Sequence, residues 1–239
     1  MATDTESGTG KIRRGIGVPQ QDAPVQAWSP PSADTLPPVP RSAPKASTPK
    51  STPKPAPLPP EARLHPPGSN MVLIEAGEFI MGDDDGARDE QPQNRVLLNA
   101  YWIDRYPVTN RDYKAFVDAT DHRAPPHWKS GNHTSARDLH SVTNTNWEDA
   151  IAYARWSGKR LPTEAEWEKA ARGTLGQNYP WGDAFRKDNV NSSNDYEGTT
   201  PVNQFPGGAS PYGVMDMCGN VQEWCTDWYY DDMYTTSAL

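Results

Sequence analysis

Residues 158–173 read GKRLPTEAEWEKAARG, and this stretch predicts a short helix with one buried face. Thr163 and Glu166 have the spacing of a capping box, in which each side chain accepts a hydrogen bond from a free backbone amide of the first turn. Gly173 is the expected end of the helix. The buried stripe should contain the aromatic and small residues at helical spacing, namely Trp167, Ala170 and Ala171.

Two earlier segments have similar start signals and predict two more helices. Thr109 opens the first, with Asp112 at the third helical position, and Asn146 opens the second, which Gly158 ends. The residues expected on the buried faces are Tyr113, Phe116 and Val117 in the first helix, and Trp147, Ala150, Ile151 and Ala154 in the second.

Short apolar runs before these helices predict strands. The runs 71–74 and 79–81 lie on either side of Gly77, so we expect a hairpin with Gly77 in its turn. A further strand should end at Pro107, because apolar residues alternate before it at Val96, Leu98, Tyr101 and Ile103. Short strands together with short helices indicate an α+β fold.

The first 67 residues differ in composition from the remainder. They hold 16 of the 25 prolines and a single aromatic residue, Trp28, and they have no apolar periodicity. Such a segment cannot bury enough apolar surface to offset the entropy lost on ordering. We therefore predict a disordered, Pro-rich tail or linker over 1–67 and one folded domain over 68–239.

Charge and hydropathy exclude several classes of partner. Residues 68–239 carry 15 Lys and Arg against 26 Asp and Glu, a net formal charge of −11, which repels phosphate backbones and suits hard cations. We expect no nucleic-acid partner. The first 30 residues lack the apolar core of a secretory signal, and no stretch approaches 18 apolar residues, so we expect no membrane partner and a cytoplasmic location.

The chain after Gly173 is rich in Asn, Gly, Asp and Ser and predicts a long irregular region. Aromatic residues nevertheless recur through it, at Trp181, Tyr196, Phe205, Tyr212 and Trp224. We expect this region to be packed against the domain, with bound ions holding part of its backbone.

Several motifs, taken in order, resemble the formylglycine-generating enzyme (sulfatase-modifying factor) family. MVLIEAGEFIMG and YPVTNRDYKAFV are similar to its opening. They are followed by GKRLPTEAEWEKAARG, YPWGD, GTTPV, SPYGVMDMCGNVQEW and DWY. The resemblance covers about residues 69–230. It implies an α+β fold related to C-type lectins, with three short helices, short strands and much irregular loop.

The resemblance also implies a reaction. The founding activity of the family is the oxidation of a sulfatase cysteine, within a Cys-x-Pro-x-Arg motif, to formylglycine by oxygen and a copper(I) ion held by two cysteines. In the family those cysteines follow an Arg-Gly-Gly-Ser-Trp-like strand, and this chain ends before such a stretch. The resemblance therefore implies a domain that is incomplete at its C-terminus and inactive as an oxidase as written.

The only two cysteines, Cys218 and Cys225, leave three interpretations open: a disulfide, a metal-binding pair, or two packed thiols. Neither cysteine matches the position of a copper ligand in the family. We expect two packed thiols, and we find no catalytic residue to assign. Gln222 lies between them, where enzymes of the family often carry a tryptophan near the active site.

The resemblance implies two structural calcium sites with mixed side-chain and carbonyl ligands. The ligands of the first would be the Asn189 and Asn194 side chains with the Val190 and Tyr196 carbonyls. Those of the second would be Asp216 and Glu223 with the Gly219 and Val221 carbonyls. Such oxygen sets suit Ca²⁺. Alternatively, these Asn and Asp residues serve only as turn formers.

Other polar groups have less specific patterns. Four histidines lie within or beside one polar loop, at His122, His127, His133 and His140. They could hold a metal, but no pair has helical i, i+4 spacing, so we expect solvated loop residues. Glu164 and Glu168 should lie on the exposed face of their helix.

Two functions follow from these observations. One is a formylglycine-generating oxidase that acts on a sulfatase-like Cys-x-Pro-x-Arg segment, with its copper-binding residues outside this chain. The other is a non-catalytic module of the same fold that binds a ligand or a protein.

Overall fold

The computed structural model describes residues 70–192 and 196–229. The tail predicted to be disordered, residues 1–67, lies outside the described residues. No helix within the described ranges is both long and apolar enough to cross a membrane.

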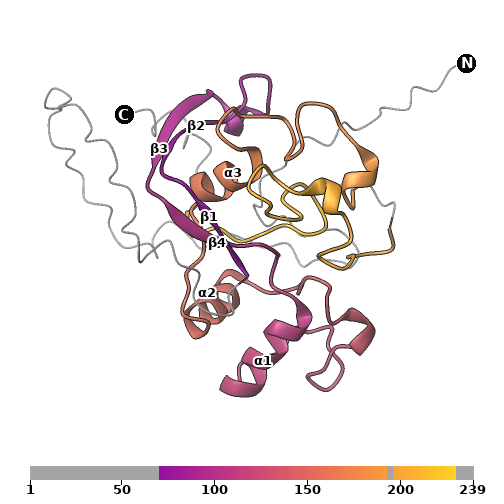
Figure 1. Ribbon diagram of the computed structural model, residues 1–239. Helices are drawn as coiled ribbons and strands as arrows, with labels where there is room; N and C mark the ends of the chain where they lie inside the picture. Colours follow the sequence, from indigo (N-terminus) through magenta and orange to yellow (C-terminus); the bar gives the residue numbers. More distant parts are fainter. Residues whose placement is uncertain (1–69, 193–195, 230–239) are drawn as a thin grey trace, which may run out of the picture. The chain divides into compact units, whose positions relative to one another are not determined.

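A two-stranded antiparallel ribbon opens the domain. Strand β1 (Met71–Ile74) pairs with β4 (Tyr101–Asp104), and β2 (Gly77–Met81) pairs with β3 (Asn94–Leu98). The same register runs through both pairs. Residues 82–93, which include the short 3-10 helix η3 (Arg88–Glu90), connect the two sides of the ribbon. In Figure 1, β2 continues in the direction of β1 along one side of the ribbon.

The predicted hairpin across Gly77 is therefore wrong. The chain passes from β1 to β2 without reversing, and Gly77 has a φ of 149°, which side-chain-bearing residues rarely adopt. The buried Lys169 holds this junction, because its Nζ donates to the carbonyls of Glu75 at 2.8 Å and Gly77 at 2.9 Å. A lysine from a distant helix thus satisfies two backbone carbonyls at the junction between β1 and β2.

The three predicted helices begin where their capping signals stand. Helix α1 (Asn110–Thr120), α2 (Trp147–Trp156) and α3 (Glu164–Arg172) start after Thr109, Asn146 and Thr163 respectively. Each of these three side chains accepts a hydrogen bond from the backbone amide three residues later. Gly173 ends α3 with a φ of 71°.

The helix faces were predicted less accurately than the helix starts. Tyr113 and Phe116 in α1 are buried as expected, and so are Trp167, Ala170 and Ala171 in α3. In α2 only Ala154 of the predicted stripe is fully buried. Glu168 was expected to be exposed but is 2% exposed, because it pairs with Arg172 and accepts a bond from the Gly82 amide at 2.8 Å.

The main core joins the ribbon, α3 and the chain after residue 213. Its buried members are Val72, Ile74, Tyr101, Trp167, Ala170, Ala171, Val214 and Met217. A second cluster of Tyr113, Phe116 and Trp128 packs beside α1 and α2. Figure 1 shows α3 beside β2 and β3, with α1 and α2 lying beyond β4.

The irregular region after Gly173 is packed, as expected, but not mainly through the predicted anchors. It contains the 3-10 turns η5 (Lys187–Asn189) and η6 (Pro206–Gly208); another, η4 (Ser135–Arg137), precedes α2. Phe205 is buried, whereas Tyr196 is 41% exposed. Among the described residues of this region, the buried apolar side chains also include Tyr179, Pro180, Val190, Val202, Val214, Met215 and Met217.

Candidate functional site

The loop after Val214 presents the acidic groups of the second predicted calcium site. Asp216 and Asn220 both have left-handed backbones, with φ of 60° and 69°, so the chain turns sharply at both ends of this segment. Asn220 Nδ2 donates to Asp216 Oδ2 at 2.8 Å. Burial raises the pKa of Asp216 to about 6, although this hydrogen bond opposes the shift.

Glu223 lies close enough to Asp216 for their charges to interact. Trp167 Nε1 donates to Glu223 Oε2 at 3.0 Å. Burial, together with the negative charges of Asp216 and Asp104, raises the pKa of Glu223 to about 7, although the Trp167 hydrogen bond opposes the shift. A hard cation bound between these two carboxylates would offset the repulsion between their negative charges. The two side chains therefore suit a Ca²⁺ ion.

The same loop packs closely on residues 189–191. A Cβ atom on Gly219 would lie 2.5 Å from the Asn191 carbonyl oxygen and 2.5 Å from Val190 Cγ2, so only glycine fits there. The Asn220 amide donates to the Asn191 carbonyl at 3.0 Å. The carbonyls of Gly219 and Val221 therefore belong to a tightly held turn beside Asp216.

The first predicted calcium site cannot be assembled from the described residues, because Asn194 lies outside them. Asn189 belongs to η5, and its carbonyl packs against Gly208 so closely that no side chain fits at that glycine. The Tyr196 carbonyl accepts a bond from the Gly198 amide at 2.9 Å, and the Val190 side chain is buried. Calcium remains a prediction at both sites.

The two cysteines are free thiols, which rules out the disulfide interpretation. Burial raises the pKa of the Cys218 thiol to about 12. Burial also raises the pKa of Cys225, and the carboxylates of Glu223 and Glu164 add to the shift. Copper(I) binds thiolates, so a copper pair at these positions would require both buried thiols to lose their protons on binding. Within the described ranges no cluster of three or more His, Cys, Asp and Glu side chains could hold a metal ion.

The histidine loop is only partly solvated. His122 Nε2 lies 2.8 Å from Asp149 Oδ1, and His133 Nε2 lies 2.7 Å from Asp138 Oδ1, with the His133 side chain 11% exposed. These histidines make internal ion-pair or hydrogen-bond contacts.

A cavity of about 530 Å³ opens beside residues 214–224, the acidic loop that carries Asp216 and Glu223. The sequence did not predict this cavity. Its wall combines β4, residues 106–108, helix α2 and residues 221–224. Most of the lining is apolar or aromatic, and Gln222 and Glu223 also reach it. Trp224 Nε1 donates to the Thr145 carbonyl at 3.1 Å, which ties the acidic loop to the segment before α2.

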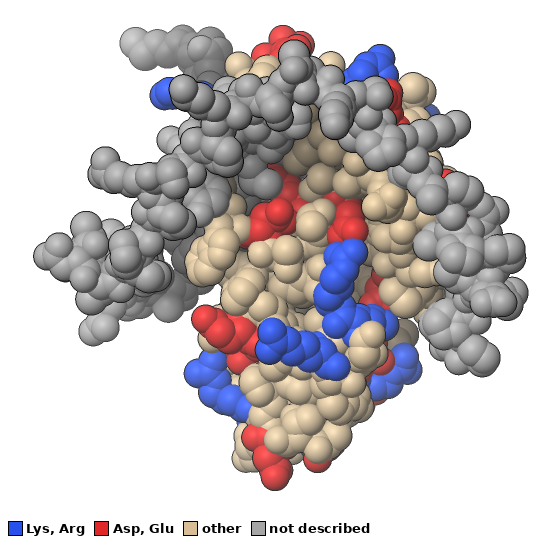
Figure 2. Space-filling view, turned by 90° about the vertical axis from the view of Figure 1, so that its left-hand side faces the viewer, with Lys and Arg blue, Asp and Glu red and all other residues tan. Residues whose placement is uncertain are grey.

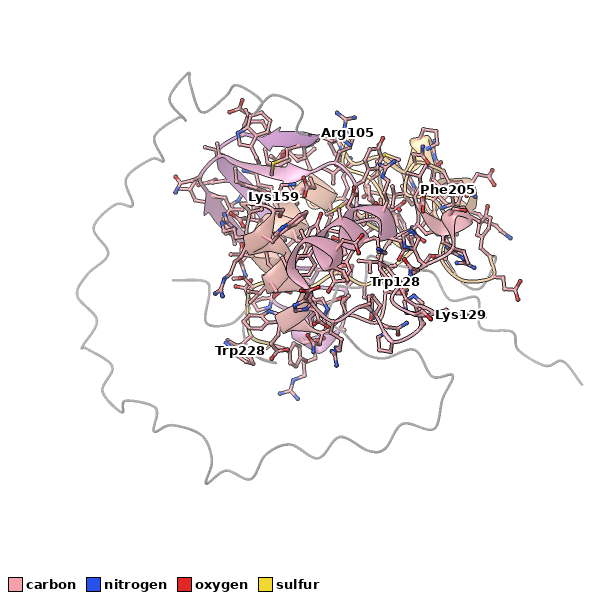
Figure 3. The ribbon with its side chains drawn as sticks, turned by 90° about the horizontal axis from the view of Figure 1, so that it is seen from below. Arg105, Trp128, Lys129, Lys159, Phe205 and Trp228 are labelled. Atoms are coloured by element: carbon pink, nitrogen blue, oxygen red, sulfur yellow. The ribbon has the colours of Figure 1, made fainter. Side chains whose placement is uncertain are left out.

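The basic side chains that line the cavity are already paired. Lys159 Nζ donates to Asp104 at 2.7 and 2.8 Å, and Arg160 donates to both carboxylate oxygens of Glu166 at 2.6 and 2.7 Å. Figure 2 shows acidic and basic side chains in adjoining patches on one face, so the described part of that face does not carry charge of a single sign. In Figure 3, Lys159 lies among the ribbon and helices, whereas Trp228 lies at the periphery.

Residues 56–238 match the model of a protein family described as "Sulfatase-modifying factor enzyme 1-like domain". The chain belongs to the sulfatase-modifying factor family. The formylglycine-generating enzyme of Thermomonospora curvata is 36% identical over an alignment that covers 70% of this chain and 74% of that protein. The solved structure of PvdO from Pseudomonas aeruginosa has the same fold, with a TM-score of 0.57 and 29% identity, covering 70% of this chain and 73% of that one.

Members of the sulfatase-modifying factor family also occur within longer proteins. The serine/threonine-protein kinase Pkn1 of Chlamydia trachomatis is 39% identical over an alignment that covers 75% of this chain. This chain spans only 31% of the length of that kinase. The expected fold is confirmed, and the family by itself does not fix one role for the domain.

Proposed function

We propose that this domain binds an extended, cysteine-containing segment of a partner protein in the cavity beside β4 and α2. The cavity is the observation that carries the proposal, because its volume and apolar wall suit a few residues of polypeptide. The formylglycine-generating relatives support a protein partner. A sulfatase-like Cys-x-Pro-x-Arg segment is the ligand to test first.

Calcium in this proposal has a structural role. Asp216 and Glu223, with the carbonyls of Gly219 and Val221, would hold the ion. When bound, the ion neutralises the two carboxylates and fixes the loop that bears Glu223 and Gln222 at the cavity wall. Trp167 and Asn220 orient the two carboxylates through their hydrogen bonds.

The domain, in this proposal, binds the segment without oxidising it. Cys218 and Cys225 are the only thiols of the chain, and their raised pKa values keep them protonated near neutral pH. Cys225 packs against the main hydrophobic core. Their positions suit two packed thiols better than a redox centre.

A binding titration tests the proposal. A fluorescent Cys-x-Pro-x-Arg peptide is titrated with the full 239-residue chain in calcium and followed by anisotropy. We expect saturable binding that Ala150→Phe weakens at least about tenfold, because Ala150 lines the cavity. Ala115→Phe is the matched control, since Ala115 is exposed on α1. Absence of binding, or equal binding by both variants, would overturn the proposal.

Oxidation to formylglycine is the second candidate, favoured by the similarity to the Thermomonospora curvata enzyme. The purified chain is incubated with copper(I), oxygen and the same peptide. The mass of the peptide is then measured by mass spectrometry. We expect no conversion of the cysteine to an aldehyde. Conversion that is lost in Cys218→Ser or Cys225→Ser would place copper chemistry at these thiols.

A further inference from the structure

The cavity lies along one edge of strand β4. Successive side chains of a strand point to opposite faces of the sheet. Tyr101 and Ile103 point to the main core, since Tyr101 belongs to the buried cluster and Ile103 packs against it. Asp104 points to the other face, where its carboxylate pairs with Lys159. Because all of residues 100–104 line the cavity, the cavity follows the edge of the strand and not one of its faces.

The backbone groups of Asp104 point to this outer edge of β4. The Arg105 amide donates to the Asn70 carbonyl at 2.9 Å, on the side of the strand that faces β1. Neighbouring residues of a strand direct their backbone groups to opposite sides, so the amide and carbonyl of Asp104 point away from β1. The side chains of Asp104 and Lys159 are 35% and 33% exposed, so a ligand can reach this part of the strand.

The opposite edge of the ribbon is already covered by the chain itself. There the Ile80 amide donates to the Thr174 carbonyl at 3.2 Å, and the Gly82 amide donates to Glu168 at 2.8 Å. Helix α3 and the residues after it therefore close the β2 side. Within the described residues β1 and β4 form a two-stranded sheet, so β4 is an edge strand. An edge strand is a template on which a further strand can pair.

We propose that the polypeptide segment in the cavity adds a third strand to the ribbon, along the outer edge of β4. This inference rests on the proposed function and specifies how the segment is recognised. Main-chain amides and carbonyls of the segment bond those of β4, with Asp104 as one of the pairing residues. The backbone groups of a strand edge match another polypeptide backbone, and the apolar wall of the cavity receives the side chains.

The proline of a Cys-x-Pro-x-Arg segment determines which of its residues face β4. Alternate residues of a strand direct their amides to the same neighbour, and proline has no amide hydrogen to donate. The backbone of the proline therefore faces away from β4, and so do the backbone groups of the cysteine and the arginine. The two variable residues supply the bonds to β4. The side chains of the cysteine, proline and arginine consequently share one face of the added strand.

Methylation of single peptide amides tests this register without altering the chain. A fluorescent Cys-x-Pro-x-Arg peptide with alanine at both variable positions is N-methylated at either alanine and titrated with the calcium-loaded, 239-residue chain. We expect the affinity to fall about tenfold, because the methyl group removes a hydrogen bond and obstructs the strand edge. The same methylation at the arginine amide is the matched control and should change the affinity less than about twofold.

Amide hydrogen exchange gives a second readout, on the chain itself. Binding of the unmethylated peptide should slow exchange at Asp104 and leave it unchanged at Ile103, whose amide already faces β1. Equal effects of methylation at the alanine and arginine positions, or unchanged exchange at Asp104, would overturn the inference. If Ala150→Phe still weakens binding in those cases, the proposed function stands alone. An unmethylated peptide that does not bind would overturn both.

Discussion

Trp167 donates its indole N–H to the carboxylate of Glu223 across 3.0 Å, and this bond joins helix α3 to the acidic loop. Trp167 is 5% exposed and belongs to the main core, so the position of Glu223 depends on the packing of α3. The helix that begins at the capping box of Thr163 and Glu166 therefore also positions Glu223, which lines the cavity.

Trp167→Phe should destabilise the chain by about 1–3 kcal/mol, because Glu223 loses its donor in a buried setting. Urea unfolding measures the change. Trp181→Phe is the control, since its indole bonds the Ala184 carbonyl at an exposed position and its loss should matter less. The effect of Trp167→Phe should shrink in a Glu223→Gln background, where no charge is left unpaired. Equal effects in both backgrounds would contradict the role assigned to this bond.

Calcium should raise the melting temperature through Asp216 and Glu223. An ion that binds only the folded chain stabilises it by about 2.7 kcal/mol at a concentration of 100 Kd. A chelator should lower the melting temperature of the wild-type chain, and Asp216→Ala should abolish that difference. Asp118→Ala, at an exposed position on α1, should retain it. A wild-type melting temperature that is identical with and without chelator would argue against the ion.

Lys169→Met should unfold at lower urea concentration than the wild-type chain. The ammonium group bonds the carbonyls of Glu75 and Gly77, and each carbonyl left without a donor is unfavourable by about 1–3 kcal/mol. Part of this loss of unfolding free energy is offset, because methionine removes a buried charge. Lys114→Met is the control, since Lys114 pairs with the exposed Asp118. No difference between the two variants would mean that Lys169 does not hold the ribbon junction.

The start of each helix could be predicted from the sequence because capping is local. Thr163 and Glu166 are three residues apart, and nothing distant is needed to satisfy those amides. The ribbon could not be predicted in the same way. Its junction at Gly77 depends on Lys169, which lies 92 residues away and resembles an ordinary surface lysine in the sequence.

The candidate site also has a part that local sequence predicts and a part that depends on distant segments. Asp216 and Glu223 lie in one motif, so the resemblance was enough to pair them, and the structure brings them into electrostatic contact. The cavity is assembled from segments far apart in the chain. Tyr113 was expected only as a core residue, and Ser141 had no pattern that would have marked it.

Glu166 should make stability depend on pH in the acid range. Burial raises its pKa, but hydrogen bonds from Arg160 and Thr163 outweigh burial and hold the pKa below the ordinary value of 4.5. Its contribution is therefore complete above pH 4.5 and is lost as the pH falls through the folded-state pKa. The unfolding free energy of Glu166→Gln should differ from wild type most at pH 7, and the gap should narrow below pH 4.5.

Urea unfolding at a series of pH values measures that gap. Glu148→Gln, exposed on α2, should show a small difference that does not change with pH. A gap for Glu166→Gln that stays constant down to about pH 3 would mean that its carboxylate is not held by Arg160 in solution.

Photo-crosslinking is the most direct test of the claim that the cavity binds polypeptide. A Cys-x-Pro-x-Arg peptide with a diazirine side chain beside its cysteine is irradiated with the calcium-loaded chain, and the crosslinked residues are mapped by mass spectrometry. We predict crosslinks within residues 101–108, 141–154 and 221–224, which contribute to the wall of the cavity. Crosslinks confined to residues 178–192 and 196–208, away from the cavity, would contradict the account.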